Sequence, residues 1–158
     1  MADASFLDAG PDTPLTLKAE DAGDLSIIST LVQDAVLPGS EISYDRKARR
    51  LALLINRFRW EDAEAAKRDG RPFERVRSLL IIGDVLRLQS DGVEQDADTV
   101  LELLALSWQP DADGTGRLML EFAGDGTLVA HVECINLDLR DVTKPYVAPS
   151  GKAPSHPE

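Results

Sequence analysis

Residues 49–61 read RRLALLINRFRWE, and this stretch decides the fold class of the chain. Residues 51–55 are all apolar, which is typical of a central strand that is buried on both faces. Beyond them arginines and aromatic residues alternate, so the strand leaves the core with two different faces. One face carries Asn56, Phe58 and Trp60, and the other carries Arg57, Arg59 and Glu61.

An amphipathic helix is predicted upstream of this strand. Asp21 can cap its N-terminus, with Asp24 three residues later in an acidic version of the capping box. Apolar residues then recur at helical spacing as far as Val36, and Pro38 with Gly39 ends the helix. The chain therefore places one helix before its central strand.

The remainder of the chain favours strands joined by short turns. We predict about seven strands, over residues 41–45, 49–60, 73–82, 85–89, 100–108, 118–122 and 128–139. Residues 15–19 can form a further short strand, and 100–108 fit either a strand or a helix start that runs into one. Residues 61–70 are charged and rich in alanine, which suggests a helical turn followed by a mobile loop.

Two positions in these strands indicate bends. Gly83 interrupts an apolar run, and the apolar face changes phase between Cys134 and Ile135. Long bent strands in consecutive hairpins predict an α+β fold that is mostly antiparallel β-sheet, with one N-terminal amphipathic helix. The sheet would form a curled meander, a small barrel or a two-layer sandwich.

A chain of 158 residues suits one domain. We expect a flexible arm over residues 1–13, a single α+β domain over 14–143, and a disordered proline-rich tail over 144–158. The N-terminus lacks the features of a signal peptide, the single cysteine suits a reducing compartment, and no segment approaches the ~20 apolar residues that span a bilayer. We therefore expect a cytoplasmic protein that does not enter a membrane.

Charge is unevenly distributed along the chain. Residues 44–77 hold 11 basic and 6 acidic residues, a net charge of +5, whereas the whole chain carries −11 and the remainder therefore −16. The net acidity argues against binding to DNA, RNA or an anionic membrane. Either the two parts attract each other within the fold or between subunits, or the basic segment meets an anionic ligand or partner.

Candidate catalytic and metal-binding residues are few. His131 and Glu133 lie on one face of a predicted strand, where they fit either acid-base chemistry or a solvated polar pair. Cys134 is expected to pack on the apolar face as a small hydrophobe. Residues 111–116 resemble half of a calcium loop, but its twelfth position is Phe122, so a hairpin turn fits better. Phosphate-binding glycine motifs are absent from the sequence, and we expect no cofactor, no metal and no catalytic residue.

The arginine-aromatic end of the central strand is the main candidate for a binding surface. Arginine forks beside aromatic rings can grip phosphate and stack on bases, and both residue types are favoured at interface centres. The alternative is that the rings complete the core while the arginines pair with acids of a neighbouring strand. The candidate residues for ligand or partner binding are Asn56, Arg57, Arg59, Trp60, Arg75 and Arg77.

Four segments together resemble a known family. They read DLSIISTLVQDAVL, RRLALLINRFRWE, FERVRSLLIIGDVLRLQSDGV and VECINLDLRDV. The chain is similar over residues 15–143 to the uncharacterised bacterial family of domain of unknown function 2948, with LLINRFRWE and VECINLDLRD as the most specific strings. The resemblance implies a small stand-alone cytoplasmic bacterial protein, and it implies no activity, cofactor or site.

These observations favour a non-catalytic binding or protein-protein interaction domain that forms a homodimer. The expected partner is a second copy of the chain or another protein, with no nucleic acid and no membrane. An alternative is a binder of a small anionic ligand, a nucleotide or a phosphosugar, with Asn56, Arg57 and Arg59 lining the open end of a barrel. A further alternative is an enzyme that uses His131 and Glu133.

Overall fold

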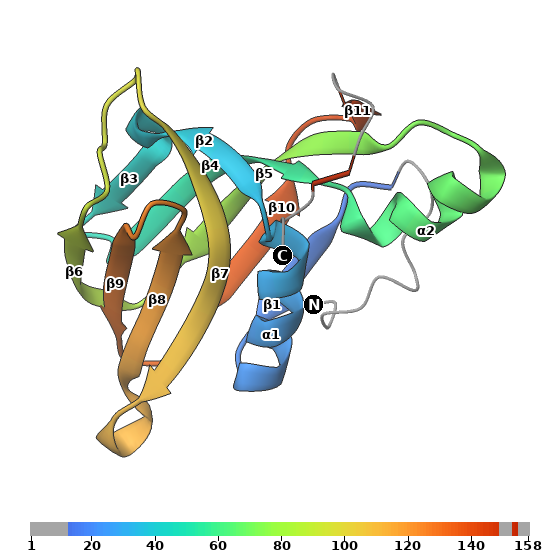
Figure 1. Ribbon diagram of the computed structural model, residues 1–158. Helices are drawn as coiled ribbons and strands as arrows, with labels where there is room; N and C mark the ends of the chain where they lie inside the picture. The colour runs from blue at the N-terminus through green and yellow to red at the C-terminus, as the bar shows by residue number, and fades with distance from the viewer. Residues whose placement is uncertain (1–12, 149–152, 155–158) are drawn as a thin grey trace.

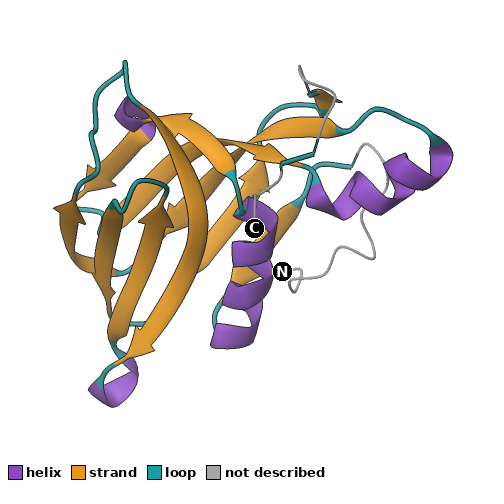
Figure 2. Ribbon diagram, in the orientation of Figure 1, coloured by secondary structure: helices purple, strands orange, loops and turns teal. Residues whose placement is uncertain are grey.

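The computed structural model describes residues 13–148 and 153–154. These residues form one 11-stranded sheet with two α-helices and two short 3-10 turns (Figures 1 and 2). In chain order the elements are β1 (Thr16–Ala19), α1 (Ala22–Val32), β2 (Ala35–Pro38), η1 (Gly39–Glu41), β3 (Ile42–Asp45), β4 (Arg50–Phe58), α2 (Trp60–Asp69), β5 (Glu74–Ile82), β6 (Val85–Asp91), β7 (Val100–Pro110), η2 (Ala112–Gly114), β8 (Gly116–Phe122), β9 (Thr127–Val132), β10 (Leu137–Asp141) and β11 (Tyr146–Val147).

The strands follow the order β1-β10-β5-β4-β2-β7-β8-β9-β6, with β3 beside β4 and β11 beside β5. Every one of these pairings is antiparallel, which confirms the predicted class of sheet. The sequence predicted too few elements, with about seven strands and a single N-terminal helix. The described residues form eleven strands, and a second helix lies in the middle of the chain.

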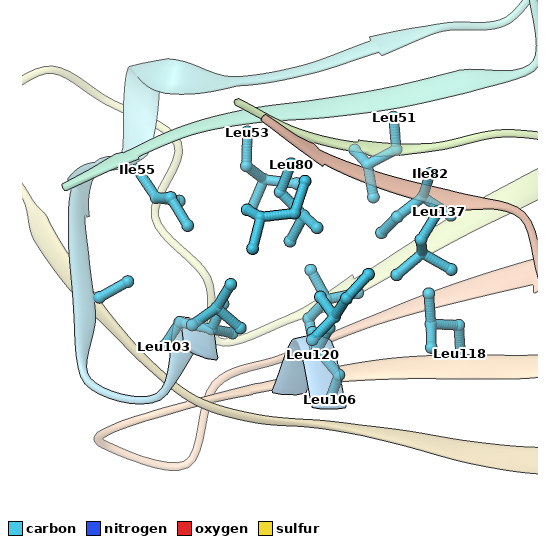
Figure 3. Close-up of a cluster of buried hydrophobic side chains, with 14 of the residues drawn as sticks. Leu51, Leu53, Ile55, Leu80, Ile82, Leu103, Leu106, Leu118, Leu120 and Leu137 are labelled. Atoms are coloured by element: carbon cyan, nitrogen blue, oxygen red, sulfur yellow. The ribbon is translucent and has the colours of Figure 1, made fainter. Parts of the chain in front are cut away.

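The sheet curls so that its two halves face each other across a hydrophobic core (Figure 1). Leucine and isoleucine side chains from β4, β5 and β10 point toward those of β7 and β8 (Figure 3). Leu53 at the centre of β4 is fully buried, opposite Ile42 of β3 on one side and Leu80 of β5 on the other. The apolar run of the sequence is therefore the central strand that it predicted.

Helix α1 packs against β7, β1 and β4. Its N-cap is Asp21, whose carboxylate accepts a hydrogen bond from the backbone N–H of Asp24 at 2.8 Å, as predicted. The helix ends at Val32, earlier than the sequence pattern indicated. The backbone enters the left-handed region at Asp34 (φ 64°), and the next residues form β2 instead of continuing the helix.

A second helix begins directly after the central strand. The strand was predicted to continue to Trp60, but β4 ends at Phe58, and Trp60 opens α2. The predicted helical turn with a mobile loop is thus a helix of ten residues. It ends at Asp69 and is capped by Gly70, whose left-handed conformation (φ 68°) suits a residue without Cβ.

Both predicted bends are present. Asp84 follows Gly83 with φ 56° and separates β5 from β6. The phase change after β9 occurs in a bend over residues 133–136, and β10 begins on the other side of it. Because Cys134 lies in that bend and not in a strand, it is exposed, contrary to the expected burial. Its thiol lies 3.4 Å from a carboxylate oxygen of Asp84.

The folded part extends beyond the expected domain boundary at residue 143. Strand β11 pairs with β5, and Ala148 is buried. Residues 1–12 of the expected arm, and residues 149–152 and 155–158 of the expected tail, lie outside the described residues. Residues 100–110 form a strand without a helical start. None of the described helices is both long and apolar enough for a membrane-spanning segment.

Candidate functional site

Arg57 lies inside the protein, with 0% of its surface exposed. Its guanidinium donates to both carboxylate oxygens of Glu61, at 2.8 and 2.7 Å. The same group reaches a carboxylate oxygen of Asp141 at 3.0 Å, the hydroxyl of Ser78 at 2.9 Å and the carbonyl of Phe58 at 3.4 Å. These contacts use its whole set of N–H donors.

The break between β4 and α2 creates this arrangement. The chain turns into a helix two residues after Arg57, and this turn brings Glu61 back over the end of the strand at i+4. Asp141 comes from β10, two strands away from β4 in the sheet. It also accepts hydrogen bonds from the Ser78 hydroxyl at 2.7 Å and from the backbone N–H of Leu15 at 2.9 Å. One buried network therefore joins four elements and the residue before β1.

Both members of the central ion pair are held in their charged forms. Burial alone would lower the pKa of Arg57, but its hydrogen bonds and charge interactions with Glu61 and Asp141 raise that pKa above its usual value. Burial alone would raise the pKa of Glu61, but the hydrogen bond and charge of Arg57 lower it below its usual value. The carboxylate and the guanidinium thus stay ionised together inside the fold.

Arg59 is also buried, with 4% of its surface exposed. Its guanidinium contacts Glu74 at 2.6 Å and lies 3.7 Å from Asp62 and 4.0 Å from Glu61. The sequence placed Arg57 and Arg59 at an accessible surface, whereas the structure places both in an internal cluster of acids. They cannot reach an external ligand without a rearrangement of these contacts.

The other predicted site residues lie elsewhere. Asn56 and Arg77 are cross-strand partners on the outer face of the sheet. Arg75 donates to the side-chain oxygen of Asn56 at 2.8 Å and to its carbonyl at 2.9 Å. Burial lowers the pKa of Arg75, only partly offset by nearby acidic groups. Trp60 packs edge-on against Phe58, with ring centroids 4.6 Å apart, and donates its indole N–H to the carbonyl of Gln33.

A hollow of about 260 Å³ lies on this outer face and gathers two of the predicted residues. Its lining is mostly apolar and is formed by Val36, Leu37, Pro38, Glu41, Leu54, Ile55, Asn56, Arg77 and Val100. A second hollow of about 440 Å³ lies between α1 and α2. It is lined by Thr30, Leu31, Gln33, Trp60, Glu61, Ala63 and Glu64. The predicted residues thus divide among an internal network, an outer face and an interhelical groove.

His131 and Glu133 have different partners. The His131 ring lies 2.8 Å from the side-chain oxygen of Gln89, and the Glu133 carboxylate pairs with Arg49 at 2.8 Å. Residues 111–115 form a short turn between β7 and β8, and Gly116 begins β8. Within the described part of the chain, no three histidine, cysteine or acidic residues gather closely enough to hold a metal ion.

Comparison with known proteins identifies one family. The profile of the family described as Protein of unknown function (DUF2948) matches residues 15–156, most of the chain. The chain belongs to this family. No curated protein and no solved structure shows significant similarity to it. The match covers the central strand, the buried network and both hollows, so membership in the family confirms the predicted resemblance without assigning a function to any of them.

Proposed function

We propose that this DUF2948 member is a protein-protein interaction domain that pairs with a second copy through the outer face of β2, β4 and β5. The observation that carries the proposal is the apolar character of that face. Leu54 of β4 lies opposite Leu79 of β5, and both are only half-buried. Val36 is also half-buried, and Val100 is 70% exposed. A sheet face that is exposed to solvent is normally polar. Contiguous apolar side chains on such a face therefore indicate a contact surface.

The charges around the hollow support a second copy as the partner. Arg77 belongs to β5 and Glu41 to η1, on opposite sides of β4, and both are exposed. Neither side chain forms an ion pair with another of the described residues. In a face-to-face pair with its two-fold axis along β4, the β5 side of one copy, which carries Arg77, would lie over the η1 side of the other, which carries Glu41. The face thus carries one charge of each sign on its two sides, which suits pairing with itself.

A reciprocal charge exchange tests this pairing. Sedimentation velocity over a wide concentration range should show a dimer for the wild type. Arg77→Glu should raise the dimer dissociation constant about tenfold or more, because it places two acids together at each end of the contact. Glu41→Arg in the same chain should restore dimerisation. Arg46→Glu, the same charge reversal in the turn after β3, should leave it unchanged.

Two results would refute the proposal. One is a wild-type chain that stays monomeric at the highest concentration. The other is a dimer that responds equally to the changes at Arg77 and Arg46.

A small anionic ligand at the same hollow is a second candidate, supported by the side chains of Asn56 and Arg77 in its lining. Thermal shift with a panel of nucleotides and phosphosugars checks it, because a ligand that binds only the folded state raises the melting temperature. Under this proposal Arg77→Gln removes the response to the ligand. Under the dimer proposal the panel leaves the melting temperature unchanged.

A further inference from the structure

A second group of basic side chains lies on the outer face of the other half of the sheet. Arg87 of β6 is the direct cross-strand partner of His131 of β9, and His131 is the direct partner of Arg117 of β8. Directly opposed residues in antiparallel strands have Cβ atoms about 4.5–5.5 Å apart and share one face. Arg87 and Arg117 are exposed and flank His131, which is partly exposed. We call these three residues the basic row.

The basic row gathers positive charge that the fold does not neutralise. Each arginine lies directly opposite His131, so protonation of this ring would place like charges directly opposite each other, which destabilises a sheet. Several other arginines of the described residues pair with acids, as at Arg57 and Arg59. In the part of the chain that the structure describes, neither Arg87 nor Arg117 has a carboxylate within ion-pair distance. Two guanidiniums that flank one histidine on the same sheet face, without a carboxylate partner in a chain of net charge −11, therefore indicate an external counter-charge.

His131 can add a third charge to this row. Its Nε2 donates to the side-chain oxygen of Gln89 at 2.8 Å, which leaves Nδ1 as the titrating atom. The charged groups around the ring are Arg87, Arg117 and Asp111, the last in the turn after β7. Burial has the largest effect on the pKa of His131 and lowers it, and the two arginines lower it further. Asp111 acts in the opposite direction. An anion bound between the guanidiniums would reverse the effect of the arginines and favour the imidazolium.

We propose that Arg87, His131 and Arg117 bind a small oxyanion with two negative charges, of the kind found in a phosphate or sulfate group. The guanidinium fork matches the oxygens of such a group, and two forks on either side of an imidazole can hold it from three directions. A long polyanion does not fit, because the net charge of the chain repels it. Binding strengthens as the pH falls through the pKa of His131.

Proton NMR of the histidine rings tests this site directly, because the chain has only two histidines. The His131 ring is titrated with pH in sulfate and in chloride at equal ionic strength, and His156 serves as the internal reference. Sulfate stays a dianion throughout the titration, so only the protein changes its charge. The pKa of His131 should be higher in sulfate by about 1, whereas that of His156 should be the same in both salts. Equal values for His131 would overturn the proposal.

Substitutions distinguish sulfate binding at the basic row from general screening of charges by the salt. Arg87→Gln with Arg117→Gln should abolish the response of His131 to sulfate, and unchanged melting temperatures verify that the variant is folded. Arg140→Gln, which removes an exposed arginine of β10, should keep the full response. A response that survives the double substitution would refute the site. The basic row lies on strands outside the proposed dimer face, so sedimentation of these variants reports on that proposal separately.

The source of the oxyanion is resolved by comparing inorganic phosphate with glycerol phosphate. Binding of each is followed by the same ring signal. A dissociation constant at least about tenfold lower for the ester assigns the site to a phosphorylated metabolite. Equal constants assign it to the free ion. Binding of neither, together with no response to sulfate, would overturn the proposal.

Discussion

Arg57 and Glu61 form a bidentate ion pair, with hydrogen bonds of 2.8 and 2.7 Å, in which the Arg57 side chain is fully buried and the Glu61 side chain is 5% exposed. They are four residues apart, one at the end of the central strand and the other in the first turn of α2. The pair therefore fixes the angle at which that helix leaves the sheet. It also connects α2 through Asp141 to β10, two strands away from β4 in the sheet. An ionic cluster of this kind strongly penalises the loss of one partner.

Replacement of Glu61 by glutamine should destabilise the protein by about 3 kcal/mol or more, because Arg57 then keeps its charge in the interior with only Asp141 to balance it. Urea unfolding followed by circular dichroism measures the change. Glu64→Gln is the matched control, since Glu64 is an exposed residue of the same helix, and it should change the free energy of unfolding by less than about 0.5 kcal/mol. Equal effects of the two substitutions would contradict the central role of the pair.

The free energy of unfolding should depend on pH through the titration of Glu61. Its folded-state pKa lies below the unfolded value of about 4.3. The pair thus contributes its full stabilisation above that pH, and the contribution is lost as the pH falls through the folded-state pKa. The difference in unfolding free energy between wild type and Glu61→Gln should therefore be large at neutral pH and shrink in acid. A difference that is constant with pH would exclude this assignment.

Leu53→Ala should cost about 2–5 kcal/mol, because it opens a cavity in the centre of the core. The neighbouring Leu54→Ala is an internal control, since Leu54 faces outward and is only half-buried. It should cost distinctly less in chemical denaturation. If the two variants lost similar stability, the assignment of inner and outer faces in β4 would be incorrect.

Gly39→Ala should loosen the acidic loop between β6 and β7. A Cβ at this position would collide with the carbonyl oxygen of Glu94. The backbone fixes the positions of both atoms, so a change of side-chain rotamer cannot relieve the collision. The backbone N–H of Gly39 also holds the loop through Thr99 at 2.9 Å. We expect a loss of about 1–3 kcal/mol and faster proteolysis within residues 92–99. Ser40→Ala, at an exposed neighbour, should be cleaved at the wild-type rate.

The central strand was predictable because an unbroken run of apolar residues is stable only in the buried interior of a small protein. The N-cap of α1 was predictable for a similar reason, since its chemistry is local. The premature end of that helix was not, because the left-handed backbone at Asp34 interrupts an otherwise continuous helical pattern. Strand order was also beyond the sequence, since pairing between distant strands leaves no local signal.

The candidate site shows the same limit. Arg57 has the same alternation parity as Leu53 and Ile55, so the pattern itself placed its side chain on the buried face. Glu61, four residues after Arg57, was a second signal that Arg57 is paired within the fold. This signal becomes visible once α2 is known to begin at Trp60. The basic row had no signal at all, because its members are 14 or more positions apart and meet only through the registers of β6, β8 and β9.

The position of β10 between β1 and β5 sets the timing of folding. The first strand cannot join the sheet until the tenth has been synthesised, because among the described strands β1 pairs with β10 alone. On the ribosome, residues 16–19 must therefore wait, with their hydrogen-bonding groups turned to water, while more than a hundred further residues are added. Strand β10 then joins β1 to β5, and its last residue, Asp141, completes the buried network around Arg57, so a nascent chain released before Asp141 would lack that network.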